Sequence, residues 1–129
     1  MTATKPRILC VDDESEILKF LEAVLVPKGY EVIKAENGEE ALEKLKEERV
    51  DLVISDVRMP QMGGPQLVDQ LRQVRQDFKA LYISGYTDNS ITHRGVLEKG
   101  MNYIQKPFTI DGLARKVREV LDKNSKPAT

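Results

Sequence analysis

The sequence predicts an α/β fold in which a parallel sheet of five strands is covered by helices on both faces. Short apolar runs alternate along the chain with segments whose apolar residues recur at helical spacing. The runs are apolar throughout, which is typical of parallel strands buried on both faces. The alternation contains no repeat and no internal linker. We therefore expect one domain, for which 129 residues with 40% hydrophobic content are sufficient.

The first part of the chain predicts two strands and two helices. Residues 7–11 form an apolar run that acidic residues end abruptly, and a helix follows with Ser15 as its N-cap. Residues 30–35 predict a second strand near the sheet edge, because charged side chains interrupt it. Asn37, with Glu40 three residues later, predicts a capping box at the start of the second helix.

The middle of the chain continues the alternation. Residues 51–56 form an apolar strand that ends in an acid, and a loop rich in turn residues follows. Pro65 suits the first turn of the next helix, and residues 80–83 predict the fourth strand. The apolar residues of that helix expected to face the core are Leu67, Val68, Leu71 and Val74.

The last part of the chain predicts a helix at residues 88–99, a fifth strand at residues 101–104 and a final helix capped by Thr109. The apolar residues of the final helix expected to face the core are Ile110, Leu113, Val117, Val120 and Leu121. With this helix, five strands alternate with five helices, which favours a doubly wound sheet.

Residues 7–123 are expected to form the domain, with a flexible lead at 1–6 and a flexible tail at 124–129. The 20 Lys and Arg residues nearly balance the 21 Asp and Glu residues, so we expect no direct binding of nucleic acid. No apolar segment has the length of a membrane span, and the N-terminus lacks the apolar core of a signal peptide. A single cysteine, Cys10, provides no disulfide framework. These features predict a cytoplasmic protein without membrane insertion.

Five polar residues fall at or just past the carboxyl ends of predicted strands. They are Asp12, Asp13, Asp56, Ser84 and Lys106. Ligands of such sheets bind beyond the carboxyl ends of the strands, so one crevice can collect all five side chains. Carboxylates that converge with an ammonium group predict a site for a hard divalent cation and a phosphoryl group.

Magnesium prefers oxygen ligands and keeps several waters, so one or two carboxylates are enough to hold it. We expect Asp13 and Asp56 to be direct ligands and Asp12 to act through water. The backbone carbonyl of Arg58 is a further candidate ligand. With its charge neutralised, the Asp56 carboxylate becomes a candidate nucleophile toward phosphorus.

Each of these residues also has an ordinary structural explanation. Asp12 or Asp13 alone would serve as a helix cap. Lys106 would be a solvated surface lysine, and Ser84 before a glycine would be a turn residue. In the site, however, Lys106 would pair with Asp56 or a phosphoryl oxygen, and Ser84 would donate to the same oxygen. The joint pattern favours the site.

Four motifs resemble the receiver domain of two-component response regulators. They are VDDE at 11–14, SDVRMPQMGG at 55–64, SGYT at 84–87 and YIQKPF at 103–108. The resemblance covers nearly the whole chain. It implies a flavodoxin-like fold with strand order 2-1-3-4-5, the order established for a chemotaxis member of this same family. The sequence around the last two motifs is also similar to receivers fused to hybrid sensor histidine kinases.

The resemblance implies a phosphoacceptor module of a phosphorelay. Asp56 would take a phosphoryl group from phosphohistidine on a histidine kinase or a histidine phosphotransfer protein. Asp12 and Asp13 correspond to the acidic pair that organises Mg²⁺, for which Mn²⁺ is expected to substitute. Lys106 corresponds to the invariant lysine of the family. Beyond self-catalysed transfer to Asp56 and slow autodephosphorylation, the chain would not be an enzyme.

The resemblance also implies a switch. Ser84 corresponds to the switch hydroxyl and Tyr103 to the switch aromatic, which would turn from exposed to buried when a phosphoryl group draws Ser84 inward. The face formed by the fourth helix, fifth strand and fifth helix would then bind a downstream protein, with the chain a monomer or a phosphorylation-dependent dimer. Arg58 and Tyr86 flank the position of the attacking water, which predicts slow loss of the phosphoryl group.

The sequence disfavours two other functions and leaves a third open. A haloacid-dehalogenase-like phosphatase needs a second acid two residues after its nucleophile, where this chain has Arg58. A flavodoxin-like cofactor site needs a phosphate-binding loop after the first strand, where Asp12 and Asp13 would repel phosphate. An interaction module that is never phosphorylated stays open, and magnesium-dependent labelling by a small acyl phosphate separates it from a receiver.

Overall fold

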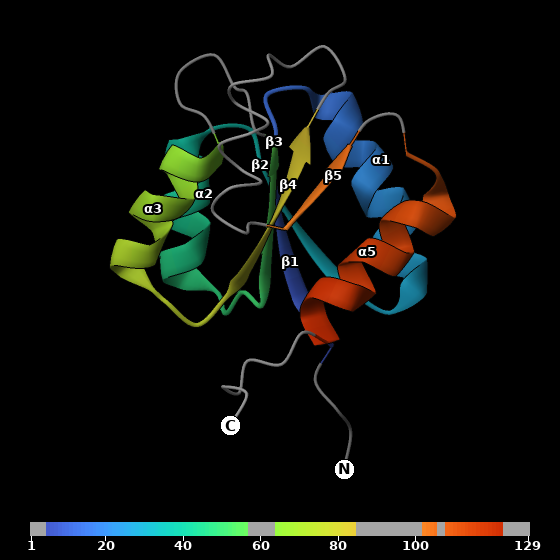
Figure 1. Cartoon of the computed structure of the whole chain (residues 1–129). Coiled ribbons are helices and arrows are strands. Elements are labelled where there is room, and N and C mark those ends of the chain that lie inside the picture. Colours follow the sequence, from blue (N-terminus) through green and yellow to red (C-terminus); the bar gives the residue numbers. More distant parts are fainter. Residues whose placement is uncertain (1–4, 57–63, 85–101, 106–107, 123–129) are drawn as a thin grey trace.

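The computed structural model of the chain describes residues 5–56, 64–84, 102–105 and 108–122 (Figure 1). Its five strands form one parallel sheet in the order β2-β1-β3-β4-β5, which confirms the expected order. The strands are β1 (Arg7–Val11), β2 (Glu31–Ala35), β3 (Leu52–Asp56), β4 (Lys79–Ser84) and β5 (Tyr103–Gln105). The helices are α1 (Ser15–Leu25), the 3₁₀ helix η1 (Val26–Lys28), α2 (Gly38–Glu47), α3 (Gly64–Val74) and α5 (Ile110–Asp122). The helix expected at residues 88–99 lies outside the described residues.

Helices cover both faces of the sheet, α2 and α3 on one face and α1 and α5 on the other (Figure 1). Each face has its own cluster of buried side chains. The α2/α3 face buries Leu9, Val11, Val53, Leu67, Leu71 and Tyr82, among others. The α1/α5 face buries Ile8, Cys10, Ile54, Leu21, Leu113 and Val117, among others. Successive residues of β1 and β3 thus alternate between two apolar layers, which explains why these strands are apolar runs.

Cys10 lies in the middle of β1, with no exposed surface. Burial raises the pKa of its thiol far above the ordinary value. Because the thiolate is the reactive form, this cysteine is an inert packing residue.

The start of α1 differs from the prediction. Ser15 is the first residue of the helix, and Glu14 occupies the N-cap position without a capping bond from its own side chain. The expectation that Ser15 is the N-cap was therefore wrong. Instead, the carboxylate of Asp12 accepts a hydrogen bond from the backbone N–H of Glu14, at 2.9 Å. An acid that belongs to the strand end thus satisfies a donor at the entrance to the helix.

The start of α2 confirms Asn37 as the N-cap, with a reciprocal bond from Glu40 that reaches the residue before the cap. The Asn37 side chain accepts from the backbone N–H of Glu40 at 2.9 Å, and the Glu40 carboxylate accepts from the backbone N–H of Glu36 at 2.8 Å. In the last helix, the Thr109 hydroxyl accepts from the backbone N–H of Gly112 at 2.8 Å, so that cap is confirmed as well.

Two residues expected in the core are exposed. Val74, the last residue of α3, is 42% exposed, and Ile110, the first residue of α5, is 54% exposed. Both follow the apolar period of their helices, but each stands at a helix end. Within the described ranges, no helix has the length and hydropathy needed to cross a membrane.

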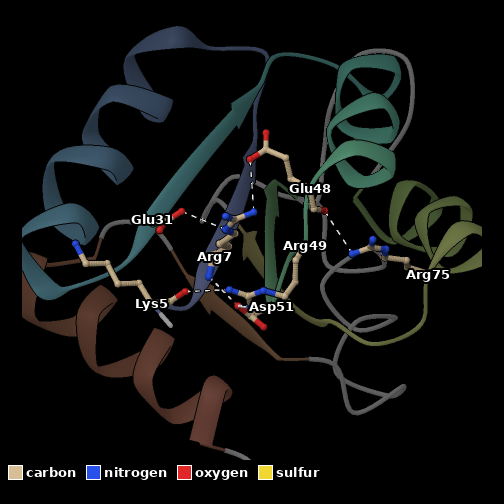
Figure 2. Close-up of polar contacts among 7 residues, drawn as sticks. All are labelled: Lys5, Arg7, Glu31, Glu48, Arg49, Asp51 and Arg75. Carbon is tan, nitrogen blue, oxygen red and sulfur yellow. Dashed lines mark hydrogen bonds and ion pairs between the residues drawn. The ribbon is translucent and has the colours of Figure 1, made fainter. Parts of the chain in front are cut away.

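The amino ends of β1, β2 and β3 are joined by charged side chains (Figure 2). We call this set the amino-edge network; it comprises Lys5, Arg7, Glu31, Glu48, Arg49, Asp51 and Arg75. Asp51 lies at its centre, where its carboxylate accepts from the backbone N–H of Arg7 at 2.8 Å and from the guanidinium of Arg49. The network lies at the edge of the sheet opposite the predicted site.

Candidate functional site

The carboxyl ends of β1 and β3 bring two of the predicted site residues together. These strands are neighbours in the sheet, and their register pairs Val11 with Ser55. The aspartates that directly follow this pair, Asp12 and Asp56, therefore occupy equivalent positions on adjacent strands. Neighbouring strands lie about 4.8 Å apart, so the two carboxylates share one end of the sheet.

Asp12 is buried, with 1% of its surface exposed. Its backbone N–H donates to the carbonyl of Ala35 at 3.1 Å, which continues the pairing of β1 with β2. Its carboxylate is held by the N–H of Glu14. Asp12 is thus fixed at both its backbone and its side chain, whereas Asp13, the next residue, is exposed.

Asp56 is the last residue of β3 and is half-buried. Its backbone carbonyl accepts a hydrogen bond from the hydroxyl of Ser55 at 3.2 Å. Ser55 was not among the predicted site residues. The sequence feature that could have identified Ser55 is its position in an otherwise apolar run, directly before Asp56.

The strands on the other side of Asp56 carry the predicted switch residues. Asp56 pairs with Ile83 of β4, and the next residue, Ser84, closes that strand opposite Gln105 of β5. The backbone of Ser84 therefore lies at the same edge of the sheet as Asp56. The side chain of Ser84 is outside the described part of the structure.

Tyr103 opens β5 and pairs with Tyr82 of β4. It is half-buried and packs against the α2/α3 cluster, of which Tyr82 is a member. Burial raises the pKa of Tyr82 to about 12, and the nearby Arg72 guanidinium opposes this shift. The predicted rotation of Tyr103 stays a prediction. Arg58, Tyr86 and Lys106 lie outside the described residues, so the roles predicted for them stay predictions.

The donor set fits magnesium in its chemistry. Asp12, Asp13 and Asp56 provide the carboxylate oxygens that a hard divalent cation prefers. In the part of the chain that the structure describes, no three His, Cys, Asp or Glu side chains form a group that could hold a metal ion. The expected convergence of three carboxylates is therefore not seen among the described residues: the strand register brings together Asp12 and Asp56, and Asp13 is exposed. Magnesium that keeps most of its waters requires one or two of these side chains.

Comparisons with known proteins agree on one family. The family model described as response regulator receiver domain matches residues 8–118. The sensor kinase CckA of Brucella abortus is 36% identical over 118 residues, which cover 90% of this chain and 12% of that kinase. The transcriptional regulatory protein PrrA of Mycobacterium tuberculosis is 33% identical over 126 residues, or 98% of this chain and 54% of the regulator. The chain thus spans about half of PrrA and a small part of CckA.

Solved structures of single receivers match over their whole length. The chemotaxis protein CheY4 of Vibrio cholerae superposes with a TM-score of 0.80 at 30% identity, covering 91% of this chain and 99% of CheY4.

Proposed function

Because this chain belongs to the response regulator receiver domain family, the phosphoacceptor signalling module of two-component systems, we propose that Asp56 is its phosphoacceptor. The observation that supports this choice most is the register that sets Asp56 beside the buried Asp12 at the carboxyl edge. In related sheets this edge is where ligands bind. Receiver domains work with histidine kinases and phosphotransfer proteins, so the donor we propose is phosphohistidine.

The proposed reaction forms one bond and breaks one. A carboxylate oxygen of Asp56 attacks phosphorus, and the bond between phosphorus and the imidazole nitrogen breaks. The electron pair of that bond stays on the imidazole, which takes up a proton. The product is an acyl phosphate on Asp56 and a free histidine on the donor.

Receiver domains generally depend on Mg²⁺, and we propose that Asp13 and Asp56 bind it directly here, with Asp12 acting through water. The bound cation neutralises the charge on the transferring phosphoryl group. The bond from Glu14 N–H keeps the Asp12 carboxylate in one orientation, which favours a preformed site. The Arg58 carbonyl and the Lys106 ammonium complete the proposed set, and Mn²⁺ substitutes for Mg²⁺.

We further propose that the chain is not an enzyme beyond this self-catalysed transfer and a slow autodephosphorylation. Arg58 and Tyr86 stand two residues beyond Asp56 and Ser84 in the sequence, where bulky side chains obstruct an attacking water. The lifetime of the phosphorylated chain in magnesium buffer measures this obstruction. A lifetime of only seconds would count against it.

The output we propose is a change in the face made by the segment 88–99, β5 and α5. Phosphorylation draws Ser84 toward the phosphoryl group and lets Tyr103 turn inward, and a downstream protein or a second copy of the chain then binds this face. Such coupling is reciprocal, so a partner that prefers the phosphorylated face also favours phosphorylation.

We also propose that the protein is cytoplasmic. Its 36% identity to the sensor kinase CckA supports a receiver of the kind attached to hybrid kinases.

A labelling experiment tests the phosphoacceptor. The full chain is incubated with acetyl phosphate and Mg²⁺, and we expect incorporation of one phosphoryl group. Asp56→Asn should abolish it. Asp69→Asn, at an exposed position of α3, is the matched control and should label like the wild type. Labelling that persists in Asp56→Asn would refute the assignment, and a wild-type chain that never labels would favour an unphosphorylated interaction module.

A further inference from the structure

Ser55 is an unusual residue for its place in the fold. It lies in β3, whose preceding residues Leu52, Val53 and Ile54 are all fully buried and apolar. Ser55 itself has no exposed surface. Within the described ranges it is one of two buried polar or charged residues, and the other is Asp12. Both residues lie at the carboxyl ends of their strands.

Apolar packing does not explain the hydroxyl. Side chains alternate along a strand, so Ser55 faces the same layer as Val53, which belongs to the α2/α3 cluster. Its register neighbours on either side, Val11 and Tyr82, belong to that cluster too. A valine would suit such a position, because a buried hydroxyl is unfavourable unless it finds a hydrogen-bond partner.

The partner of the hydroxyl is the backbone carbonyl of Asp56, at 3.2 Å. This carbonyl belongs to the peptide unit that leaves β3. A hydrogen bond to it restricts rotation of that unit about the Cα–C bond of Asp56. The bond thus fixes the direction in which the chain continues from the residue that carries the carboxylate.

We propose that Ser55 is a positioning residue for phosphoryl transfer, whose buried hydroxyl holds the backbone at Asp56 in the orientation that binds Mg²⁺. This inference rests on the proposed function of Asp56. Without the hydroxyl, the peptide after Asp56 takes several orientations, and binding the cation must select one of them. The affinity for Mg²⁺ then falls, while the rate of transfer at saturating Mg²⁺ is retained.

The matched pair Ser55→Thr and Ser55→Val isolates the hydroxyl, since threonine and valine have the same shape. Both add the same bulk to the buried site, and both are favoured in strands. Two quantities are measured on the full chain. The first is the rate of labelling by acetyl phosphate across a range of Mg²⁺ concentrations, and the second is the rise in Tm that Mg²⁺ alone produces.

We expect Ser55→Thr to require the same Mg²⁺ concentration as the wild type for half-maximal labelling. Ser55→Val should require about three to ten times more, as the loss of one hydrogen bond implies. The maximal rate should be the same in the pair. The midpoint of the Mg²⁺-induced rise in Tm should shift by the same factor as labelling, which a general loss of stability would not produce.

Equal Mg²⁺ requirements in the pair would overturn the proposal, as would a lower maximal rate in Ser55→Val with an unchanged requirement. If the added bulk prevents folding, Ser55→Ala is compared with the wild type by the same two measurements and the same criteria. The failure of the proposed function has a different signature. A wild-type chain that takes no label refutes the role of Asp56. The Mg²⁺ concentration at the midpoint of the Tm titration, compared between Ser55→Thr and Ser55→Val, then still tests the role of Ser55.

Discussion

At the amino edge of the sheet, Asp51 lies among arginines, whereas at the carboxyl edge Asp12 and Asp56 lie side by side. The Asp51 carboxylate accepts from Arg7 N–H and from the Arg49 guanidinium. Among the described residues, opposite charges therefore meet at one edge, and two carboxylates lie together at the other. The same residue type, placed at the two ends of adjacent strands, stabilises the fold in one case and is proposed to bind a cation in the other.

In the amino-edge network, acidic side chains lie against basic ones (Figure 2). The Arg7 guanidinium lies 3.2 Å from the Glu31 carboxylate and 3.8 Å from that of Glu48. The Arg49 guanidinium also donates to the carbonyl of Lys5 at 3.2 Å. These contacts join the starts of β1, β2 and β3 to the end of α2. Each of the three carboxylates of the network thus has a basic partner or neighbour.

The carboxyl edge has the opposite requirement. Two carboxylates on adjacent strands, with Asp13 next in sequence, repel one another, and this repulsion disfavours the folded state. A divalent cation bound there, as proposed, would remove this repulsion. The contribution of the carboxyl edge to the free energy of unfolding should therefore depend on Mg²⁺, and the contribution of the amino edge should not.

The largest effect that separates the two edges is stabilisation by Mg²⁺. At a concentration 100 times its dissociation constant, Mg²⁺ should raise the free energy of unfolding by about 2.7 kcal/mol. Urea unfolding with Mg²⁺ and with a chelator measures this difference. Asp13→Asn should remove most of it, while Asp51→Asn should leave it intact. An equal loss in both variants would mean that the edges do not differ in the proposed way.

A second effect concerns the charge of Asp12. Asp12→Asn keeps an oxygen that can accept from Glu14 N–H, so the entrance to α1 is retained, but it removes the charge. We expect a loss of about 10–100-fold in Mg²⁺ affinity, as for residues that support a metal through water. Calorimetric titration of the full chain measures it. An unchanged affinity would exclude Asp12 from the metal site.

At the amino edge, Asp51→Ala should lower the free energy of unfolding by about 1–2 kcal/mol, because Arg7 N–H and Arg49 lose their acceptor. Urea unfolding measures the loss. It should be the same with Mg²⁺ and without. Asp51→Asn retains one acceptor oxygen and should cost less, and a Mg²⁺-dependent loss would show that the two edges are coupled.

The smallest effect is expected for the outer ion pairs of the same network. Glu31→Gln removes the charge that faces Arg7, but the Glu31 side chain is 49% exposed. Exposed ion pairs contribute about 0–1 kcal/mol. The change in unfolding free energy should therefore stay below that of Asp51→Ala. A larger loss would assign the centre of the network to Arg7 and Glu31.

The sequence was sufficient for most of the fold because local signals and the sheet agree. The apolar runs of β1 and β3 mark strands covered on both faces, and the Asn37 N-cap sets the start of α2. Ser15, Val74 and Ile110 were misjudged at helix ends. There the outcome depends on neighbours such as Asp12, which a helical period does not record.

The site was predicted from three acids because the carboxyl ends of parallel strands must meet at one edge. The amino-edge network was missed because its pairs, such as Arg7 with Glu31 and Glu48, come from distant segments and depend on strand order. Ser55 was missed for a different reason. A serine within a strand has several ordinary explanations, and its bond to the Asp56 carbonyl appears only with the coordinates.

The most direct measurement is chemical mapping of the phosphoryl group. Borohydride reduces an acyl phosphate to an alcohol, so a phosphorylated aspartate becomes homoserine, which peptide mass spectrometry locates. After reaction of the full chain with acetyl phosphate and Mg²⁺, we predict homoserine at the position of Asp56 and unchanged aspartate at Asp12, Asp13 and Asp51. Homoserine at any of those three positions, or none at Asp56 in a chain that has taken up label, would contradict the assignment of the carboxyl edge.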